Sequence, residues 1–150
     1  MKKNKNERGQ SLVELAVSLV LLLLLLSGAV EFGMAFFQFI QLRDAAQEGA
    51  LYGSINPNTS GPIETRARGA SSSPINLNDT SLVSVDVTAW DKTTNAPKSL
   101  TSACEGDGLT VKLKYTHRIF MPFMSAVLGR NYINLSAQVT DTILTPVCGP

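Results

Sequence analysis

Glu14 is the residue whose type and position most need a chemical explanation. It stands at the edge of a leucine-rich tract, and between Ser11 and Leu42 the only other charged residue is Glu31. An ionised side chain inside a membrane costs about 2.5–3.5 kcal/mol on insertion scales, and such residues generally have a partner and a function. The position of Glu14 therefore predicts a nearby group of opposite charge.

Gly9 and Gln10 would provide that group if the chain were cut between them. Gln10 would then carry a free amine, and Glu14 would be the fifth residue of the mature chain. An ammonium and a carboxylate at the membrane edge can neutralise each other, within one chain or between neighbouring helices. If such a cut occurs, Glu14 gains a charge partner that the uncut chain lacks.

Glu31 lies on a different face of the same predicted helix. It follows Glu14 by 17 residues, which is roughly 260° of rotation at about 100° per residue. One interpretation is that Glu31 pairs with another subunit or contacts an assembly protein. The other is that the helix is displaced toward the cytoplasm, so that Glu31 lies at the outer interface of the membrane.

Enzymatic and nucleic-acid-binding functions are disfavoured by the composition. His117 is the only histidine, and no catalytic constellation surrounds it. Asp91, Glu105 and Asp107 stand near a sequence too short and irregular for a calcium loop, and Gly106–Gly108 is more simply a turn. The net charge of +1 predicts no nucleic-acid partner. We expect no enzyme activity, no metal and no cofactor.

The elements that would position these residues begin with one long helix, from about Ser11 to Tyr52. At 1.5 Å per residue it is about 60 Å long, twice a bilayer core, so residues of about 12–40 would span the membrane and the rest would pack on a domain. A basic leader, residues 1–9 with net charge +3, predicts a cytoplasmic N-terminus. Small residues at four-residue spacing predict close helix packing; they are Ala29 with Gly33, and Ala45 with Gly49. Gly53 is interpreted as a helix cap.

Behind the helix, the sequence predicts a small antiparallel sheet. Apolar and polar residues alternate over 83–90, 109–116 and 133–140, and a short helix is expected at Pro62–Ala70. The connection His117–Tyr132 is interpreted as a buried turn or short helix, or alternatively as an exposed apolar patch. Cys104 and Cys148 are expected to form a disulfide, because both lie on the exported side. The predicted fold class is α+β, a long membrane helix packed on the sheet.

Three sequence blocks resemble the TadE-like family of the tight-adherence (Flp) pilus system. They are RGQSLVELA at Arg8–Ala16, SGAVEFGMAFF at Ser27–Phe37 and LRDAAQEGALYGS at Leu42–Ser54. Val20 departs from the family pattern, where a mid-helix proline is frequent, and Gln47 and Leu51 replace frequent arginines.

The resemblance implies a minor pilin or pseudopilin that is cut between Gly9 and Gln10 by a prepilin peptidase. Its implied partners are other pilin subunits, the inner-membrane assembly platform and membrane lipid. The implied domains are a leader at 1–9, a helix at 10–54 and an exported domain at 55–150. The implied location is the bacterial cytoplasmic membrane, with the N-terminus inside, or the pilus. Two alternatives remain open, namely a permanently anchored single-pass protein with an outer ligand-binding domain, and a secreted enzyme released by cleavage near Ala29.

Overall fold

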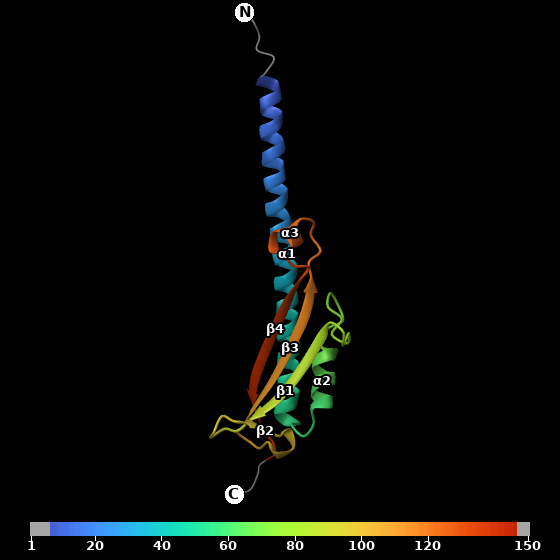
Figure 1. Ribbon diagram of the computed structural model, residues 1–150. Coiled ribbons are helices and arrows are strands. Elements are labelled where there is room, and N and C mark those ends of the chain that lie inside the picture. The colour runs from blue at the N-terminus through green and yellow to red at the C-terminus, as the bar shows by residue number, and fades with distance from the viewer. Residues whose placement is uncertain (1–6, 147–150) are drawn as a thin grey trace, which may run out of the picture. The chain divides into compact units, whose positions relative to one another are not determined.

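A computed structural model describes residues 7–146 of the chain. The sheet has the strand order β2-β1-β3-β4 (Figure 1). In chain order the elements are α1 (Glu7–Ile55), α2 (Ser60–Gly69), β1 (Val83–Trp90), β2 (Pro97–Lys98), the 3-10 helix η1 (Leu100–Ser102), β3 (Gly108–Arg118), α3 (Met124–Leu128) and β4 (Tyr132–Thr142).

The described residues form two compact units, and α1 contributes to both. The helix–loop unit comprises residues 7–34 and 118–132, and the sheet unit comprises residues 35–117 and 133–146. The predicted α+β class is confirmed, because a long apolar N-terminal helix is followed by a small four-stranded sheet.

α1 is longer than predicted by several residues at its N-terminal end and a few at its C-terminal end. At that end the N–H of Asn56 still donates to the carbonyl of Tyr52 at 3.0 Å, and Pro57 follows. The interpretation of Gly53 as a cap is wrong, because Gly53 lies inside the helix. A Cβ at this position would collide with the side chain of Leu109, so Gly53 is a packing residue.

The three predicted strands are confirmed as β1, β3 and β4. β1 and β3 are antiparallel, with Val85 opposite Leu113 and Val87 opposite Val111. The fourth strand, β2, was not predicted, because it has two residues, one of them Pro97, and no alternation to detect. α2 begins at Ser60, two residues before the predicted start at Pro62.

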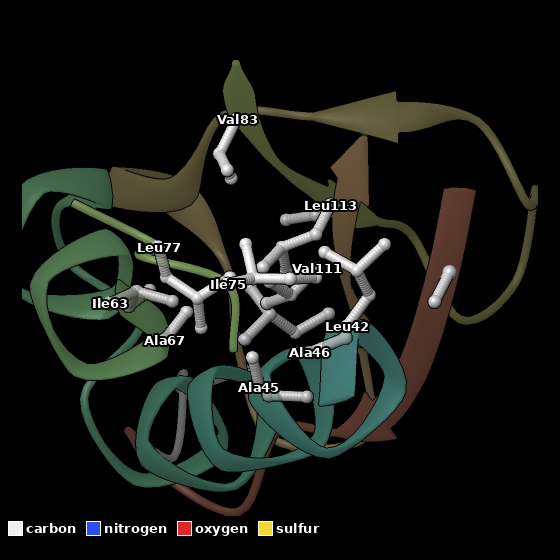
Figure 2. Packing of buried hydrophobic residues seen from close by; sticks show 14 of the residues in the cluster. Leu42, Ala45, Ala46, Ile63, Ala67, Ile75, Leu77, Val83, Val111 and Leu113 are labelled. Carbon is white, nitrogen blue, oxygen red and sulfur yellow. The ribbon is translucent and has the colours of Figure 1, made fainter. Parts of the chain in front are cut away.

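The core lies in the sheet unit, between one face of the sheet and the two helices α1 and α2. Figure 2 shows Leu42, Ala45 and Ala46 of α1 directed toward Val111 and Leu113 of β3. On the α2 side, the same cluster includes Ile63 and Ala67. Small residues on α1 allow the helix to approach the sheet closely.

The connection between β3 and β4 is a loop with a short helix, and it is not buried. α3 agrees with the predicted short helix, whereas the expected burial is wrong. Phe120 is 75% exposed and Phe123 is 66% exposed. The reason is that the core cluster draws all its residues from the sheet unit, so the loop has no core against which to fold.

Candidate functional site

The predicted cleavage site, Gly9–Gln10, lies in the first turn of α1. Both residues are exposed, and a Cβ placed on Gly9 would meet no atom within 4 Å. The peptide bond between them is therefore sterically open among the described residues, although it is part of a helix that begins at Glu7.

Glu14 already has a hydrogen-bond partner in the uncut chain. The side-chain amide of Gln10 donates to Oε1 of Glu14 at 3.3 Å, across one helical turn. An amide partner of this kind is neutral, so this hydrogen bond does not compensate the negative charge of Glu14. The pairing of Glu14 with a free amine stays a prediction.

The apolar surface of α1 near its N-terminus is open. Large side chains from Leu12 to Leu26 are exposed, and the most apolar window of the helix contains no buried residue. α1 is long and apolar enough to cross a membrane by length and composition. The core helix of a globular protein would be covered by its own chain. These observations indicate a membrane anchor.

Glu31 is the most enclosed polar group of the helix–loop unit, with 3% of its surface exposed. Its carboxylate accepts the backbone N–H of Met121 at 2.8 Å and that of Phe120 at 3.2 and 3.3 Å from its two oxygens. Hydrogen bonds to an ionised acceptor are stronger than neutral ones. Glu31 therefore fastens the β3–β4 loop to α1 within one chain, an arrangement that neither sequence interpretation included.

The four residues predicted to pack helices fall into two environments. Ala45 is buried, and a Cβ on Gly49 would lie 3.0 Å from the Ala67 side chain and 3.3 Å from that of Val111. These two residues pack α1 on the sheet unit. Ala29 is exposed, and a Cβ on Gly33 would meet nothing within 4 Å, so neither has a close partner among the described residues.

Cys104 is disulfide-bonded, and Cys148, the expected partner, lies outside the described residues. Beside Cys104, the buried carboxylate of Asp107 accepts the N–H groups of Cys104 and Lys92 at 2.9 and 3.0 Å and the ammonium of Lys98 at 2.8 Å. The hydrogen bond from Lys98, helped by those from the backbone, lowers the pKa of Asp107 from 3.8 to about 2, although burial opposes the shift.

Sequence reasoning missed both carboxylate contacts for the same reason. Most donors to Asp107 and Glu31 lie in other elements, from Lys98 at 9 positions away to Met121 at 90, and only the fold brings them near. One signal was available for Glu31, because a carboxylate in an apolar helix requires donors. Among the described residues no group of three or more acidic, His or Cys side chains is arranged to hold a metal ion.

The fold and the site define a class of protein with one long apolar helix that suits membrane anchoring and a small α+β sheet unit. Residues 9–51 match the family model described as TadE-like protein, which confirms the resemblance over that helix. No curated protein and no solved structure matches the chain.

Proposed function

We propose that this chain is a TadE-like minor pilin or pseudopilin that takes part in assembly of a tight-adherence pilus. The observation that carries the proposal is the family match, which starts at Gly9 and runs along α1 to residue 51. The exposed cleavage site and the uncovered apolar helix support the proposal, since both a peptidase and neighbouring helices need access to them.

In the proposed mechanism the basic leader stays in the cytoplasm and the sheet unit is exported. α1 holds the subunit in the cytoplasmic membrane, and a prepilin peptidase cuts after Gly9 without removing the membrane span. The new amine of Gln10 then competes with the Gln10 amide for Glu14, within the chain or across to the next subunit. Pairing the two charges lowers the cost of moving Glu14 into an apolar helix bundle.

Mass spectrometry of the mature N-terminus tests the processing step. In cells that contain the matching peptidase, the wild-type chain is expected to start at Gln10. Gly9→Leu is expected to keep Met1 or its processed equivalent, whereas Gly33→Leu, a matched change in the same helix at an equally open position, is cut normally. A wild-type chain that keeps its leader in those cells would contradict the proposal.

Glu14→Leu separates cutting from assembly. We expect this variant to be cut at Gly9 but to be lost from pilus or assembly-complex fractions, because its Gln10 amine has no carboxylate to pair with. Glu14→Asp, which keeps the charge on a shorter side chain, is expected to recover part of the incorporation. Equal incorporation of the Leu variant and the wild type would refute a role for the charge.

The anchored ligand-binding alternative receives little support from the described surface. The broad hollow between α1 and α2 in the sheet unit is open, and its Glu48 and Arg66 bind each other. The Arg66 Nε–H donates to Glu48 at 2.7 Å, so these charges compensate one another. Normal function of uncut Gly9→Leu chains would favour this alternative over the pilin proposal.

A further inference from the structure

The β3–β4 loop of the helix–loop unit carries an apolar surface that residues 7–146 leave exposed. The exposed large side chains between Arg118 and Tyr132 are those of Phe120, Phe123, Val127, Leu128 and Tyr132. Most exposed hydrophobic residues of a globular protein are scattered, whereas a contiguous group marks an interaction surface.

The loop is fixed to the apolar part of α1. Glu31 accepts the Phe120 and Met121 N–H groups, and one turn earlier a Cβ on Gly28 would lie 3.8 Å from the sulfur of Met124. The exposed side chains of the loop therefore continue the uncovered apolar surface of α1 within a single unit.

The attachment points lie near one boundary of a ~30 Å hydrocarbon core that begins at Leu12, closer to the N-terminus than the end of the span at about residue 40 expected from the sequence. If the hydrocarbon begins at Leu12, Gly28 and Glu31 follow about 24 and 28 Å farther along the helix at 1.5 Å per residue. A bilayer core is about 30 Å thick. The loop is thus fastened where the C-terminal end of the span leaves the acyl chains.

Several backbone N–H groups of the loop have hydrogen-bond acceptors within the protein, which suits a poorly hydrated environment. Besides the two N–H groups held by Glu31, the N–H of Ile119 donates to the carbonyl of Asn131 at 3.0 Å, and that of Val127 to the carbonyl of Phe123 at 3.1 Å. Irregular backbone is tolerated near lipid when its polar groups are satisfied inside the protein.

Arginines stand at both ends of the apolar stretch. Arg118 and Arg130 are exposed, and the residues between them carry no charge. Arginine stems can lie along apolar surface while the guanidinium group reaches phosphate, so this arrangement complements a phospholipid interface.

We propose that residues 118–132 form a second membrane-contacting element, which rests in the bilayer interface beside the C-terminal end of the α1 span. Its phenylalanines and Val127 lie among the parts of the acyl chains next to the headgroups, Arg118 and Arg130 reach the phosphate layer, and Glu31 holds the loop in place. The inference needs α1 to cross the membrane, but it does not depend on processing at Gly9 or on a role in a pilus.

Tryptophan fluorescence of the full chain in vesicles tests the proposal. The chain has one tryptophan, Trp90. In a Trp90→Phe background, Phe123→Trp and, separately, Val127→Trp report on the loop, and Leu22→Trp reports on the span. The vesicles contain phosphatidylcholine and phosphatidylglycerol, with the phosphatidylcholine either plain or brominated on its acyl chains. Acrylamide measures access from water.

We expect bromine to lower the emission at position 123 or 127 by a fraction comparable to that at position 22, while acrylamide has little effect. Trp90 in the wild-type chain, which belongs to the sheet unit, is the control that bromine should leave unquenched. Quenching of both loop reporters by acrylamide alone would place the loop in water and overturn the proposal. Protection from both quenchers at both positions would indicate a protein partner, such as a second copy, and would also overturn it.

Discussion

Asp107 shows how one buried carboxylate can organise a region without regular structure. It joins the Cys104 turn, the start of the turn after β1 and the ammonium of Lys98 in β2. An aspartate so enclosed is stable only because all these donors reach it, and removing its charge would leave the Lys98 ammonium without its closest partner.

The lowered pKa of Asp107 predicts a specific acid dependence of stability. The folded-state pKa is about 2, below the ordinary 3.8, so the ionised group stabilises the fold at pH values above the ordinary pKa. As the pH falls from about 4 through 2, a contribution on the order of 2 kcal/mol should be lost. Denaturant unfolding of the detergent-solubilised protein at several pH values measures it.

Asp107→Asn is expected to be less stable than the wild type at neutral pH and to lose less stability in acid. Asp86→Asn, at an exposed position paired with Lys114, is the control and should keep the wild-type acid profile. Parallel profiles for Asp107→Asn and the wild type would contradict the assignment.

Gly53 is a second residue-scale case, because its lack of a side chain admits Leu109. Gly53→Ala is expected to destabilise the sheet unit by about 1–3 kcal/mol through overpacking, partly offset by up to about 1 kcal/mol of helix propensity. Gly61→Ala in α2, where a Cβ meets nothing within 4 Å, should be neutral or stabilising. Thermal unfolding followed by near-UV circular dichroism distinguishes the two variants, and equal midpoints would refute the packing role.

For Glu31, the sequence predicted that the carboxylate needs a partner but not which groups provide it. Its cost in an apolar helix was readable from the sequence, and that cost correctly implied a partner. The partner itself, two backbone N–H groups roughly ninety positions away, has no side-chain signature and could not be predicted.

At the scale of elements, the length and clarity of each sequence pattern decided which helices and strands could be predicted. α1 contains a long apolar run and the three long strands alternate, so their existence and type were predicted, and their ends were displaced by a few residues. β2 exists only because Ala89 and Trp90 offer an open edge to Lys98 and Pro97. Of the two interpretations of the loop, burial is wrong and the exposed apolar patch agrees with the structure. The sequence left both open because apolar composition alone does not say which surface will cover a segment.

One part of α1 is the uncovered apolar span and the other belongs to the sheet unit. Matched pairs of substitutions can test whether the two parts differ in their contact with the membrane. Leu22→Arg with Leu25→Arg places two charges in the uncovered span, at a cost of about 5–7 kcal/mol on insertion scales. Leu51→Arg with Ile55→Arg makes the same change at comparably exposed positions in the sheet unit. We expect the first pair, but not the second, to reduce the fraction of protein that stays in membranes after alkaline carbonate extraction. Equal loss from both pairs would contradict the division.

At the scale of the whole molecule, the buried core belongs entirely to one unit. From Leu42 to Ile143, each residue of the cluster lies in the sheet unit, whereas the helix–loop unit exposes large apolar side chains. The sheet unit therefore has the means to fold in water, and the helix–loop unit depends on another apolar phase.

A chain that starts at Ala35 tests this division. We expect it to show β-sheet circular dichroism and cooperative unfolding, but to self-associate through the uncovered loop. Replacing Phe120, Phe123, Val127 and Leu128 with serine should make it monomeric by size-exclusion chromatography without lowering its unfolding midpoint. A truncated chain that is unfolded with either loop would show that the sheet unit needs the span.

The start of α1 at Glu7 has a consequence for the proposed cut. In an α-helix the N–H groups of Ser11, Leu12 and Val13 donate to the carbonyls of the three residues Glu7–Gly9. Every α-helix has free N–H groups in its first turn, so cutting after Gly9 moves these donors from the leader to the residues that follow Gly9 and adds an ammonium beside them. The peptidase would then do more than shorten the chain. It would bring the positive end of the helix to the membrane edge, where lipid phosphate or a neighbouring subunit can supply the acceptor.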